Sequence, residues 1–383
     1  MTFCPSCLYH TGYDATGNLL SKTNFNSQTI TYVYDNLTDR MTNKTGPGIN
    51  VSYSYDSAGR RQSMTDNSGT TTYNYDIRDR MTTKTTPFGT LSYTYTSGLL
   101  VGMSSSNVNG ASITYGYDGM ARLETVTDNN LGNTTTVYTY DANSNLETCE
   151  YPNGVKHTWS YNTVNRLTNL RISNTVGDVM LKSFTYTLGP AGNRTKVVED
   201  SGRTVDWTYD DLYRLTSETV SASTTSPNYS ASYSFDAVGN RQTRTISPTG
   251  ILPQLPDQDF TTVYDDNDRM YSAGYAYDAG GSTTSAPEGW TYTYDAENKL
   301  LTAANSSNTI SYIYDGDGSR VLKNADGVIT RYLTDTLNPT GYSQTVEELN
   351  GAYGVQKRYV YGLDLVSVTD TGSGKTYYYG GLF

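Results

Sequence analysis

A Tyr-x-Tyr-Asp motif recurs about every 21 residues along almost the whole chain, and it constrains the fold more than any other feature. The spacing loosens after Tyr209. Clear copies end at Tyr34-Asp35, Tyr55-Asp56, Tyr75-Asp76, Tyr117-Asp118, Tyr140-Asp141, Tyr209-Asp210, Tyr277-Asp278, Tyr294-Asp295 and Tyr314-Asp315. Degenerate copies end at Tyr13-Asp14, Tyr95-Thr96, Tyr161-Asn162, Tyr186-Thr187, Phe235-Asp236 and Tyr264-Asp265. The chain is therefore an array of one short unit.

Each Tyr-Asp pair begins a turn. The aspartate can accept backbone N–H groups, and the residue three positions later needs a positive φ, which fits a type I turn followed by a bulge. Glycine takes that place at Gly17, Gly59, Gly239 and Gly318, and residues that tolerate left-handed geometry take it at Asp79, Asn165, Asp268 and Asn298. Ala121, Ser144 and Tyr213 fit the place less well.

The segments between the turns read as strands. The sequence has 37 Tyr against 7 Phe and 3 Trp, together with 35 Gly, which favours strands and turns over helices. Residues two apart in a strand share a face, so successive repeats should stack pairs such as Tyr53 and Tyr55 into a tyrosine ladder. We expect an all-β protein of tandem hairpins in a curved, spiralling antiparallel sheet, with an irregular proline-containing loop near residues 247–259.

Charge and hydropathy exclude some functions. The formal net charge is −11, which opposes binding to nucleic acids or anionic lipids. No stretch approaches the 18 or so consecutive apolar residues that a membrane-spanning helix needs, and no signal peptide is visible at the start. We therefore expect no nucleic-acid partner and no membrane span.

The Tyr-Asp-x-x-Gly-Arg/Asn-Leu pattern resembles the YD repeat of the RHS (rearrangement hot spot) family, which is related to bacterial wall-associated proteins, insecticidal toxin complex subunits and animal teneurins. The resemblance covers essentially residues 9–380. It implies three regions, namely an N-terminal stub with Cys-x-x-Cys at 1–12, a YD-repeat array at 13–335, and the start of an RHS-associated core at 336–383. Both ends of the chain look cut, as in a piece of a larger polypeptide.

The resemblance also implies a function. In that family the repeats form a β-shell that can close around a toxic C-terminal polypeptide, so we expect a structural, non-enzymatic protein with a polypeptide cargo or further shell segments as partners. A secreted or cell-surface location is expected on the same ground. The family's associated core normally ends in an Asp-Pro motif that supports self-cleavage. None of the 11 prolines here follows an Asp, so self-cleavage is an alternative that the sequence speaks against.

The expected dimensions favour an open fragment of such a shell. Fifteen hairpins give about thirty strands at roughly 4.8 Å each, a strip on the order of 140 Å long. A strip of that length makes about one turn of a spiral. Its two free sheet edges would favour self-association.

Few residues are candidates for chemistry. Cys4, Cys7 and His10 have the close spacing of a metal site without an evident fourth ligand, and Asp315 with Asp317 forms an acidic cluster worth a calcium titration. His157 lies in an alternating strand, where a structural role is expected. We expect no catalytic residue, no metal and no cofactor, with the repeated aspartates stabilising turns.

A different function class stays open. Exposed tyrosine pairs could bind glycans, because aromatic faces and hydroxyl groups suit sugars, and the chain would then be a cell-surface adhesion scaffold. The residues to which we assign a structural role are those at the repeat positions. They are Tyr13, Asp14, Gly17, Tyr34, Asp35, Tyr55, Asp56, Gly59, Tyr75, Asp76, Tyr117, Asp118, Tyr140, Asp141, Tyr209, Asp210, Asp236, Gly239, Tyr294, Asp295, Tyr314, Asp315 and Gly318.

Overall fold

Antiparallel strands make up nearly all of the structure. The computed structural model describes residues 10–221, 228–249, 260–272 and 274–379, and in these ranges it contains no α-helix, only two three-residue 3₁₀ turns. The chain forms two compact units, Met1–Thr134 with Gly274–Phe383, and Thr135–Ala273. The prediction of an all-β array of hairpins is confirmed.

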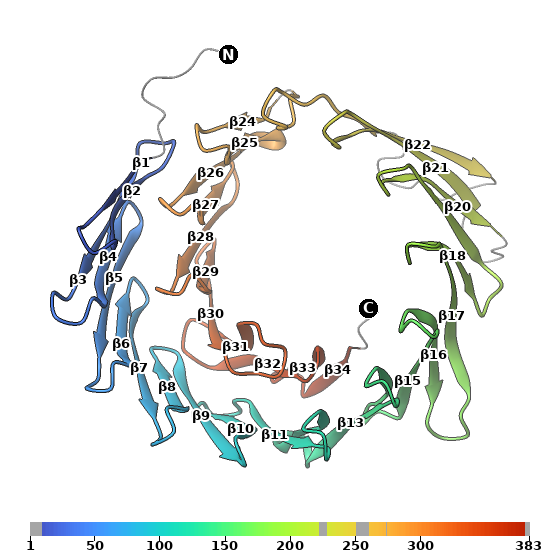
Figure 1. Ribbon diagram of the computed structural model, residues 1–383, viewed down its shortest axis with the longest axis horizontal. Helices are drawn as coiled ribbons and strands as arrows, with labels where there is room; N and C mark the ends of the chain where they lie inside the picture. Colours follow the sequence, from blue (N-terminus) through green and yellow to red (C-terminus); the bar gives the residue numbers. More distant parts are fainter. Residues whose placement is uncertain (1–9, 222–227, 250–259, 273, 380–383) are drawn as a thin grey trace. The chain divides into compact units, whose positions relative to one another are not determined.

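Unit 1 begins with the first sheet, in which each strand pairs with the next (Figure 1). Its strands are β1 (His10–Tyr13), β2 (Leu19–Thr23), β3 (Thr29–Tyr34), β4 (Met41–Gly46), β5 (Ile49–Tyr55), β6 (Arg61–Asp66), β7 (Gly69–Tyr75), β8 (Met81–Thr86), β9 (Gly89–Thr96), β10 (Leu99–Ser105), β11 (Ser112–Tyr117) and β12 (Leu123–Asp128), followed by the turn η1 (Asn129–Leu131).

Unit 1 also holds the second sheet, which has 11 strands and is open, because no pairing joins its last strand to its first in the described residues. These strands are β24 (Ala276–Tyr277), β25 (Thr283–Ala286), β26 (Trp290–Tyr294), β27 (Leu300–Ala304), β28 (Thr309–Tyr314), β29 (Arg320–Ala325), β30 (Val328–Asp335), β31 (Gln344–Leu349), β32 (Val355–Tyr361), β33 (Leu365–Asp370) and β34 (Lys375–Tyr378). The turn η2 (Pro287–Gly289) precedes β26.

Unit 2 is built from the same hairpins, paired in chain order. Its strands are β13 (Thr134–Tyr140), β14 (Leu146–Glu150), β15 (Val155–Tyr161), β16 (Leu167–Asn174), β17 (Met180–Leu188), β18 (Arg194–Glu199), β19 (Thr204–Tyr209), β20 (Leu215–Ser221), β21 (Asn228–Phe235), β22 (Arg241–Thr249) and β23 (Phe260–Thr261). Strand β22 thus includes the beginning of the loop expected near residue 247. Residues 250–259 of that loop lie outside the described part of the chain.

A bulge falls at the second tyrosine of each clear Tyr-x-Tyr copy. In the hairpin of β5 and β6, Tyr53 lies opposite Met64, but Tyr55 lies opposite Arg61, so the register shifts between Ser54 and Tyr55. The same shift occurs at Tyr34, Tyr75, Tyr117, Tyr140, Tyr209, Tyr277, Tyr294 and Tyr314, and at Tyr161 of a degenerate copy. The expectation of a turn followed by a bulge is confirmed. A shift that recurs at one repeat position twists each hairpin in the same way.

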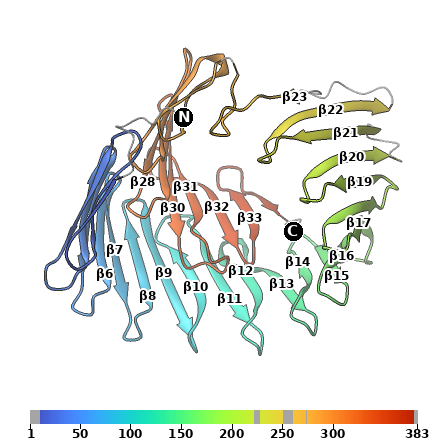
Figure 2. The ribbon, with the colours of Figure 1, turned by 45° about the horizontal axis from the view of Figure 1, so that its top comes forward.

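In unit 1 the second sheet packs on one face of the first (Figures 1 and 2). The buried cluster between them contains Ile30, Val51 and Met64 from the first sheet and Ala296 from a turn of the second. The face that the second sheet covers is the one from which Tyr53 and Tyr73 project. We call the face of each sheet that carries the Tyr-x-Tyr side chains its tyrosine face.

Unit 2 has a hydrophobic cluster on its own tyrosine face. Val197, Val205 and Val220 are buried there, and Phe184 and Trp207 pack against them. The indole N–H of Trp207 donates to Glu218, whose other oxygen accepts the hydroxyl of Tyr229. The aromatic residues of this face are therefore fixed partly by hydrogen bonds.

Candidate functional site

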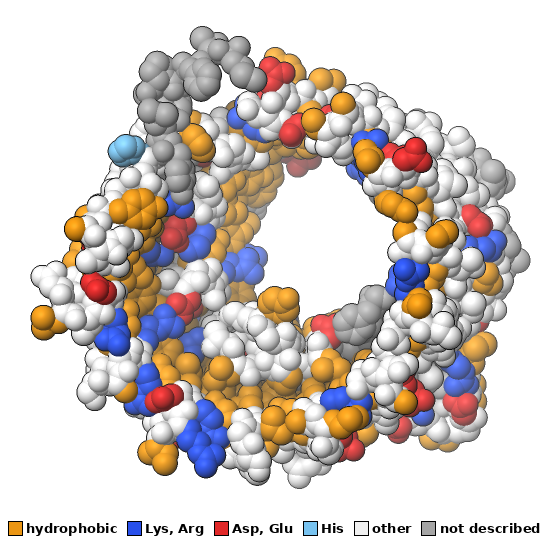
Figure 3. Space-filling model, in the orientation of Figure 1, with side chains coloured by type: hydrophobic (Ala, Val, Ile, Leu, Met, Phe, Trp, Pro, Cys, Tyr) orange, Lys and Arg blue, Asp and Glu red, His pale blue; other side chains and the backbone are white. Residues whose placement is uncertain are grey.

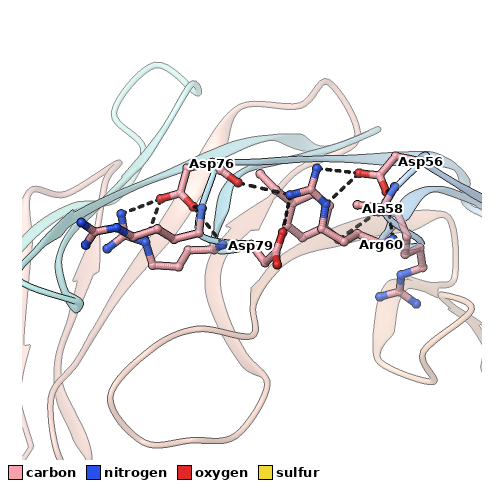
Figure 4. A network of polar contacts seen from close by, with 9 residues as sticks. Asp56, Ala58, Arg60, Asp76 and Asp79 are labelled. Carbon is pink, nitrogen blue, oxygen red and sulfur yellow. Dashed lines mark hydrogen bonds and ion pairs between the residues drawn. The ribbon is translucent and has the colours of Figure 1, made fainter.

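The aspartate that follows each second tyrosine organises the turn. Asp56 accepts the backbone N–H groups of Ala58 at 3.0 Å and Arg60 at 2.9 Å on one oxygen, and the Nε of Arg60 at 2.8 Å on the other (Figure 4). Asp76 does the same with Arg78 and Arg80. These bonds favour the ionised carboxylate, and the bond from the Arg80 side chain is the largest cause that lowers the pKa of Asp76 to about 2.

The residue that closes each turn has a positive φ whether or not it is glycine. Gly59 has φ 82° and Gly318 has φ 89°, while Asp79, Asn165, Asp268 and Asn298 have φ between 59° and 62°. Ala121, Ser144 and Tyr213 adopt the same conformation at 61°, 66° and 59°. These three residues bear a local cost of about 1–2 kcal/mol each, which the sheet on either side has to offset.

A carboxylate or amide at the closing position forms a bond between repeats. Arg60 donates to the side chain of Asp79 at 2.7 Å and to the backbone carbonyl of Asp76 at 3.2 Å (Figure 4). Equivalent bonds join Asn145 to Asn165 at 3.0 Å and Asn240 to Asp268 at 2.8 Å. The choice of Asp or Asn over Gly therefore links one turn to the next, which the sequence alone did not indicate.

The hydroxyl of the second tyrosine forms a further bond between repeats. Tyr55 donates to the carbonyl of Met41 at 2.7 Å, and Tyr75 donates to the carbonyl of Arg61 at 2.9 Å. Tyr95, Tyr161, Tyr209 and Tyr314 make the same bond to the residue that begins the second strand of the preceding hairpin. Phenylalanine cannot make this bond, which explains why the array uses Tyr so much more often than Phe.

The turns of the second sheet bring carboxylates onto the tyrosine face of the first. Asp317 accepts two hydrogen bonds from Arg61, at 2.6 and 2.8 Å, and the guanidinium lies between the rings of Tyr73 and Tyr53, 4.7 and 6.0 Å from their centroids. One turn earlier, Glu297 pairs with Lys44 at 2.9 Å. Bidentate pairing fixes the position of the turn as well as adding energy.

One position of the repeat distinguishes the turns that carry Glu297 and Asp317 from the turns of the other clear copies. Among the turns that follow a clear Tyr-Asp copy, only those at Asp295 and Asp315 carry an acidic residue two positions after the aspartate, Glu297 and Asp317. Both of these turns dock on the first sheet. The signal was therefore present in the sequence, although it can be interpreted only once the covering sheet is known.

The seam between the sheets continues as a row of buried polar contacts. Lys84 donates to the carbonyl of Thr334 at 3.1 Å, and the hydroxyl of Tyr93 donates to Asp335 at 2.8 Å. Asp335 is fully buried, and burial raises its pKa. Burial likewise raises the pKa of Tyr93, whose hydroxyl faces this carboxylate.

The far end of the seam is held by Glu347 and Arg358. Glu347, also fully buried, accepts the side-chain amide of Asn107 at 2.7 Å and the backbone N–H of Ala111 at 2.8 Å. Arg358 donates to the carbonyl of Asn109 at 3.2 Å and lies 3.7 Å from a carboxylate oxygen of Asp128. Removing one partner from such a buried set leaves a desolvated charge, so these contacts fix the register of the two sheets.

The seam encloses little space. A cavity of about 60 Å³ lies among Lys44, Asp295, Glu297 and Tyr312, and a smaller one of about 10 Å³ lies beside Lys84 and Thr334. Small-molecule sites usually enclose hundreds of Å³. The seam is thus suited to holding two polypeptide layers together.

The structure places the other predicted site residues as follows. Asp315 accepts the N–H groups of Asp317 and Ser319, and Asp317 is bound to Arg61 as described above. His10 begins β1 and is exposed, whereas Cys4 and Cys7 lie outside the described residues. The described residues contain no cluster of three or more His, Cys, Asp or Glu side chains able to hold a metal ion.

His157 and Cys149 are neighbours on adjacent strands of unit 2. Both are buried, and the His157 ring lies 5.3 Å from the ring of Tyr151 and 5.7 Å from that of Trp159. Burial lowers the pKa of His157 and raises that of Cys149 to about 12. The pair therefore packs as neutral groups, which differs from the arrangement that activates a thiol.

None of the helical segments in the described chain is long and apolar enough to cross a membrane.

Comparison with known proteins gives one repeat family and one fold. The family model described as RHS repeat matches residues 55–91. A curated protein, the tRNA3(Ser)-specific nuclease WapA of Bacillus spizizenii, is 29% identical over 152 residues, which is 38% of this chain and 6% of that protein. The chain thus spans a small fraction of that relative.

Solved structures match over nearly the entire chain. The crystal structure of TcdB2-TccC3-TEV matches with a TM-score of 0.77 and 18% identity, covering 97% of this chain and 22% of that one. TcdB2-TccC3 without its hypervariable C-terminal region matches with a TM-score of 0.75 and 17% identity, covering 95% and 22%. This likeness concerns the fold, and it extends over less than a quarter of the larger chains.

Proposed function

We propose that this chain, which is an RHS/YD-repeat protein, is a structural and non-catalytic segment of a β-shell that encloses a polypeptide. The observation that carries the proposal is the docking of the second sheet on the tyrosine face of the first, through Arg61 with Asp317 and Lys44 with Glu297. A wall made of hydrogen-bonded hairpins with a second layer seated on it is suited to separating an interior from its surroundings. The likeness in fold to the TcdB2-TccC3 structures supports this reading.

Three carboxylates of unit 1 support a structural role because they are engaged in holding layers and turns. Asp56 and Asp76 each accept backbone N–H groups of their own turn, and Glu347 accepts one from Ala111. A general acid or base needs a proton-transfer partner in a site that substrate can reach. We therefore assign these carboxylates to stability, and the chain to a non-enzymatic role.

Cargo, further shell segments and an extracellular or secreted location belong to the same proposal. They are supported by the match to the RHS repeat model and by the likeness in fold to the TcdB2-TccC3 structures. Glycan binding and self-association through sheet edges stay predictions from the sequence, and self-cleavage stays an alternative that the sequence speaks against.

Small-angle scattering with light scattering across a concentration series tests the shell role. We expect the distance distribution of a curved wall around a solvent-filled centre, either as a monomer of 42.1 kDa or as a defined assembly. A compact, solid particle would contradict the proposal. Intact-mass measurement after prolonged incubation tests the non-enzymatic part, because a specific cut would show self-cleavage.

A further inference from the structure

The second sheet repeats the arginine arrangement that receives the docking turn on the first sheet. Arg320 lies opposite Tyr314, as Arg61 lies opposite Tyr55. The guanidinium of Arg320 is 5.5 Å from the ring centroid of Tyr312 and 5.1 Å from that of Tyr332. In the other clear Tyr-Asp hairpins of unit 1 this place is held by Met41, Met81, Leu123, Thr283 and Leu300.

A second cation accompanies Arg320. Lys323 lies opposite Tyr312, which is the repeat place of Lys44 opposite Tyr32 on the first sheet. Arg320 is exposed and Lys323 is half-buried. Within the described residues neither has a carboxylate at ion-pair distance, whereas Lys44 pairs with Glu297 and Arg61 with Asp317.

The nearby carboxylate on this face is engaged elsewhere. Glu348 lies opposite Tyr332, accepts the hydroxyl of Tyr359 at 2.6 Å, and is 3.4 Å from Lys357. Figure 3 shows Lys and Arg side chains among hydrophobic ones over the second sheet of unit 1. The face thus combines aromatic surface with two cations, as the first sheet does beneath the docking turns.

We propose that the tyrosine face of the second sheet is the docking site for a further layer of the same repeat, through an Asp-x-Asp/Glu-x turn whose acidic third residue pairs with Arg320 and Lys323. The first sheet supplies the precedent, since Arg61 and Lys44 each meet the third residue of such a turn. Lys84, at the same repeat place as Lys44, also receives the second sheet, but through the backbone carbonyl of Thr334. The two turns of this kind in the chain are already bound to Arg61 and Lys44. The occupant is therefore a YD-repeat segment other than these turns.

The chain provides its own probe for this site. A cyclised hairpin peptide with the sequence of residues 309–325 carries the Asp315 to Gly318 turn with Asp317 at its third position. We would titrate the full chain into the labelled peptide at low ionic strength, where ion pairs are least screened, and follow fluorescence anisotropy. Saturable binding is expected, and it should weaken as salt is added.

Variants locate the binding. Arg320→Leu places the residue of the Leu300 hairpin at this position, and Lys323→Met places the residue found at Met64, so both should fold. Each should weaken binding about two- to fivefold, as expected for a partly exposed ion pair. Arg78→Leu removes one exposed turn cation of the first sheet and is the matched control, with no expected change. Circular dichroism of each variant checks the fold, and Arg320→Gln serves as a second substitution.

A double-mutant cycle, with one substitution in the peptide and one in the chain, separates direct pairing of Asp317 with Arg320 from a general charge effect. The Asp317→Asn peptide should bind the unchanged chain as weakly as the original peptide binds Arg320→Leu, and the two losses should not add. No saturable binding to the unchanged chain, equal binding by Arg320→Leu, or additive losses would each overturn the proposal. This proposal is independent of cargo enclosure, because it concerns the docking of one repeat layer on another. The peptide titration tests the docking, and the scattering experiment tests the shell role.

Discussion

The two sheets of unit 1 carry the same tyrosine and arginine arrangement but use it differently. On the first sheet Arg61 lies between Tyr53 and Tyr73 and is bonded to Asp317, with a side chain that is 30% exposed. On the second sheet Arg320 lies between Tyr312 and Tyr332 and is exposed. The repeat builds the sheet in both cases, and on the first sheet Arg61 is bonded to the residue two positions after a turn aspartate.

The largest expected effect comes from crowding the docked turn. A Cβ on Gly316 would lie 2.6 Å from both the Met64 sulfur and a Val51 methyl group. Gly316→Ala should therefore destabilise unit 1 by about 1–3 kcal/mol, the usual range for overpacking. Gly119 has the same place in another turn, and a Cβ built on it would meet no atom within 4 Å. Denaturant unfolding should show little change for Gly119→Ala, and equal losses at both sites would mean that the turn docks less tightly than described.

The next effect compares the two arginines directly. Arg61→Leu removes two hydrogen bonds to Asp317 and should cost about 1–2 kcal/mol, because charged hydrogen bonds are stronger than neutral ones. Arg320→Leu should change the stability of the isolated chain by less than about 0.5 kcal/mol, as surface substitutions usually do. Thermal or denaturant unfolding of the two variants measures the difference. A loss for Arg320→Leu as large as that for Arg61→Leu would remove the distinction between the sheets.

A smaller effect concerns the buried carboxylate at the seam. Burial raises the pKa of Asp335, so this carboxyl binds a proton more readily in the folded state than in the unfolded chain. The free-energy cost of burying its charge therefore falls as the pH drops through the raised pKa toward about 4. Asp335→Asn removes the charge but keeps an acceptor for Tyr93. We expect it to be more stable than the original chain at pH 7, by about 1 kcal/mol or less, with the gap closing in acid. A gap independent of pH would contradict the assignment.

The turn carboxylates should respond in the opposite direction. Hydrogen bonds within the turn, above all from the Arg80 and Arg269 side chains, lower the pKa of Asp76 and Asp265 to about 2. Their contribution to stability is complete above the usual carboxyl range near 3.8 and is lost as the pH falls through about 2. NMR titration of these side chains checks the values. Midpoints near 3.8 would show that the turn bonds do not favour the ionised form.

The smallest expected effect separates the backbone strain of a positive φ at the closing position of a turn from the hydrogen bond that a side chain at that position can form. Ala121→Gly relieves a φ of 61° and should stabilise the chain by a few tenths to about 1 kcal/mol. Asp79→Gly relieves the same φ but removes the bond from Arg60, so its net change should be less favourable. The difference between the two unfolding free energies estimates the bond between repeats. A difference of zero would leave that bond without a measurable role.

Much of the fold could be predicted from the sequence because it is local. The Tyr-Asp spacing, the residues at positive φ and the bulge at each second tyrosine all arise within one hairpin. Asp79 and Asn165 were assigned to the right conformation for the same reason. Their bonds to Arg60 and Asn145 were missed, because those bonds join residues about one repeat apart.

The docking of the second sheet could not be predicted in the same way. Asp317 and Arg61 are separated by 256 positions, and no local pattern indicates that they meet. In the sequence Asp317 stands out as part of an acidic cluster with Asp315, whereas Arg61 stands where most other repeats of unit 1 carry an apolar residue. A charged residue at a position that is usually apolar is the signal that could have located the seam.

The tyrosine hydroxyl that bonds to the preceding hairpin has a consequence for how such chains evolve. Where the second tyrosine is present and forms this bond, a hairpin donates to the carbonyl that begins the second strand of the hairpin before it, as Tyr75 does to Arg61 and Tyr55 to Met41. A whole repeat can therefore be duplicated or lost without creating an unmatched group, because the new neighbours present the same donor and acceptor. Recombination within the gene can in this way change the length of the sheet while its construction stays the same.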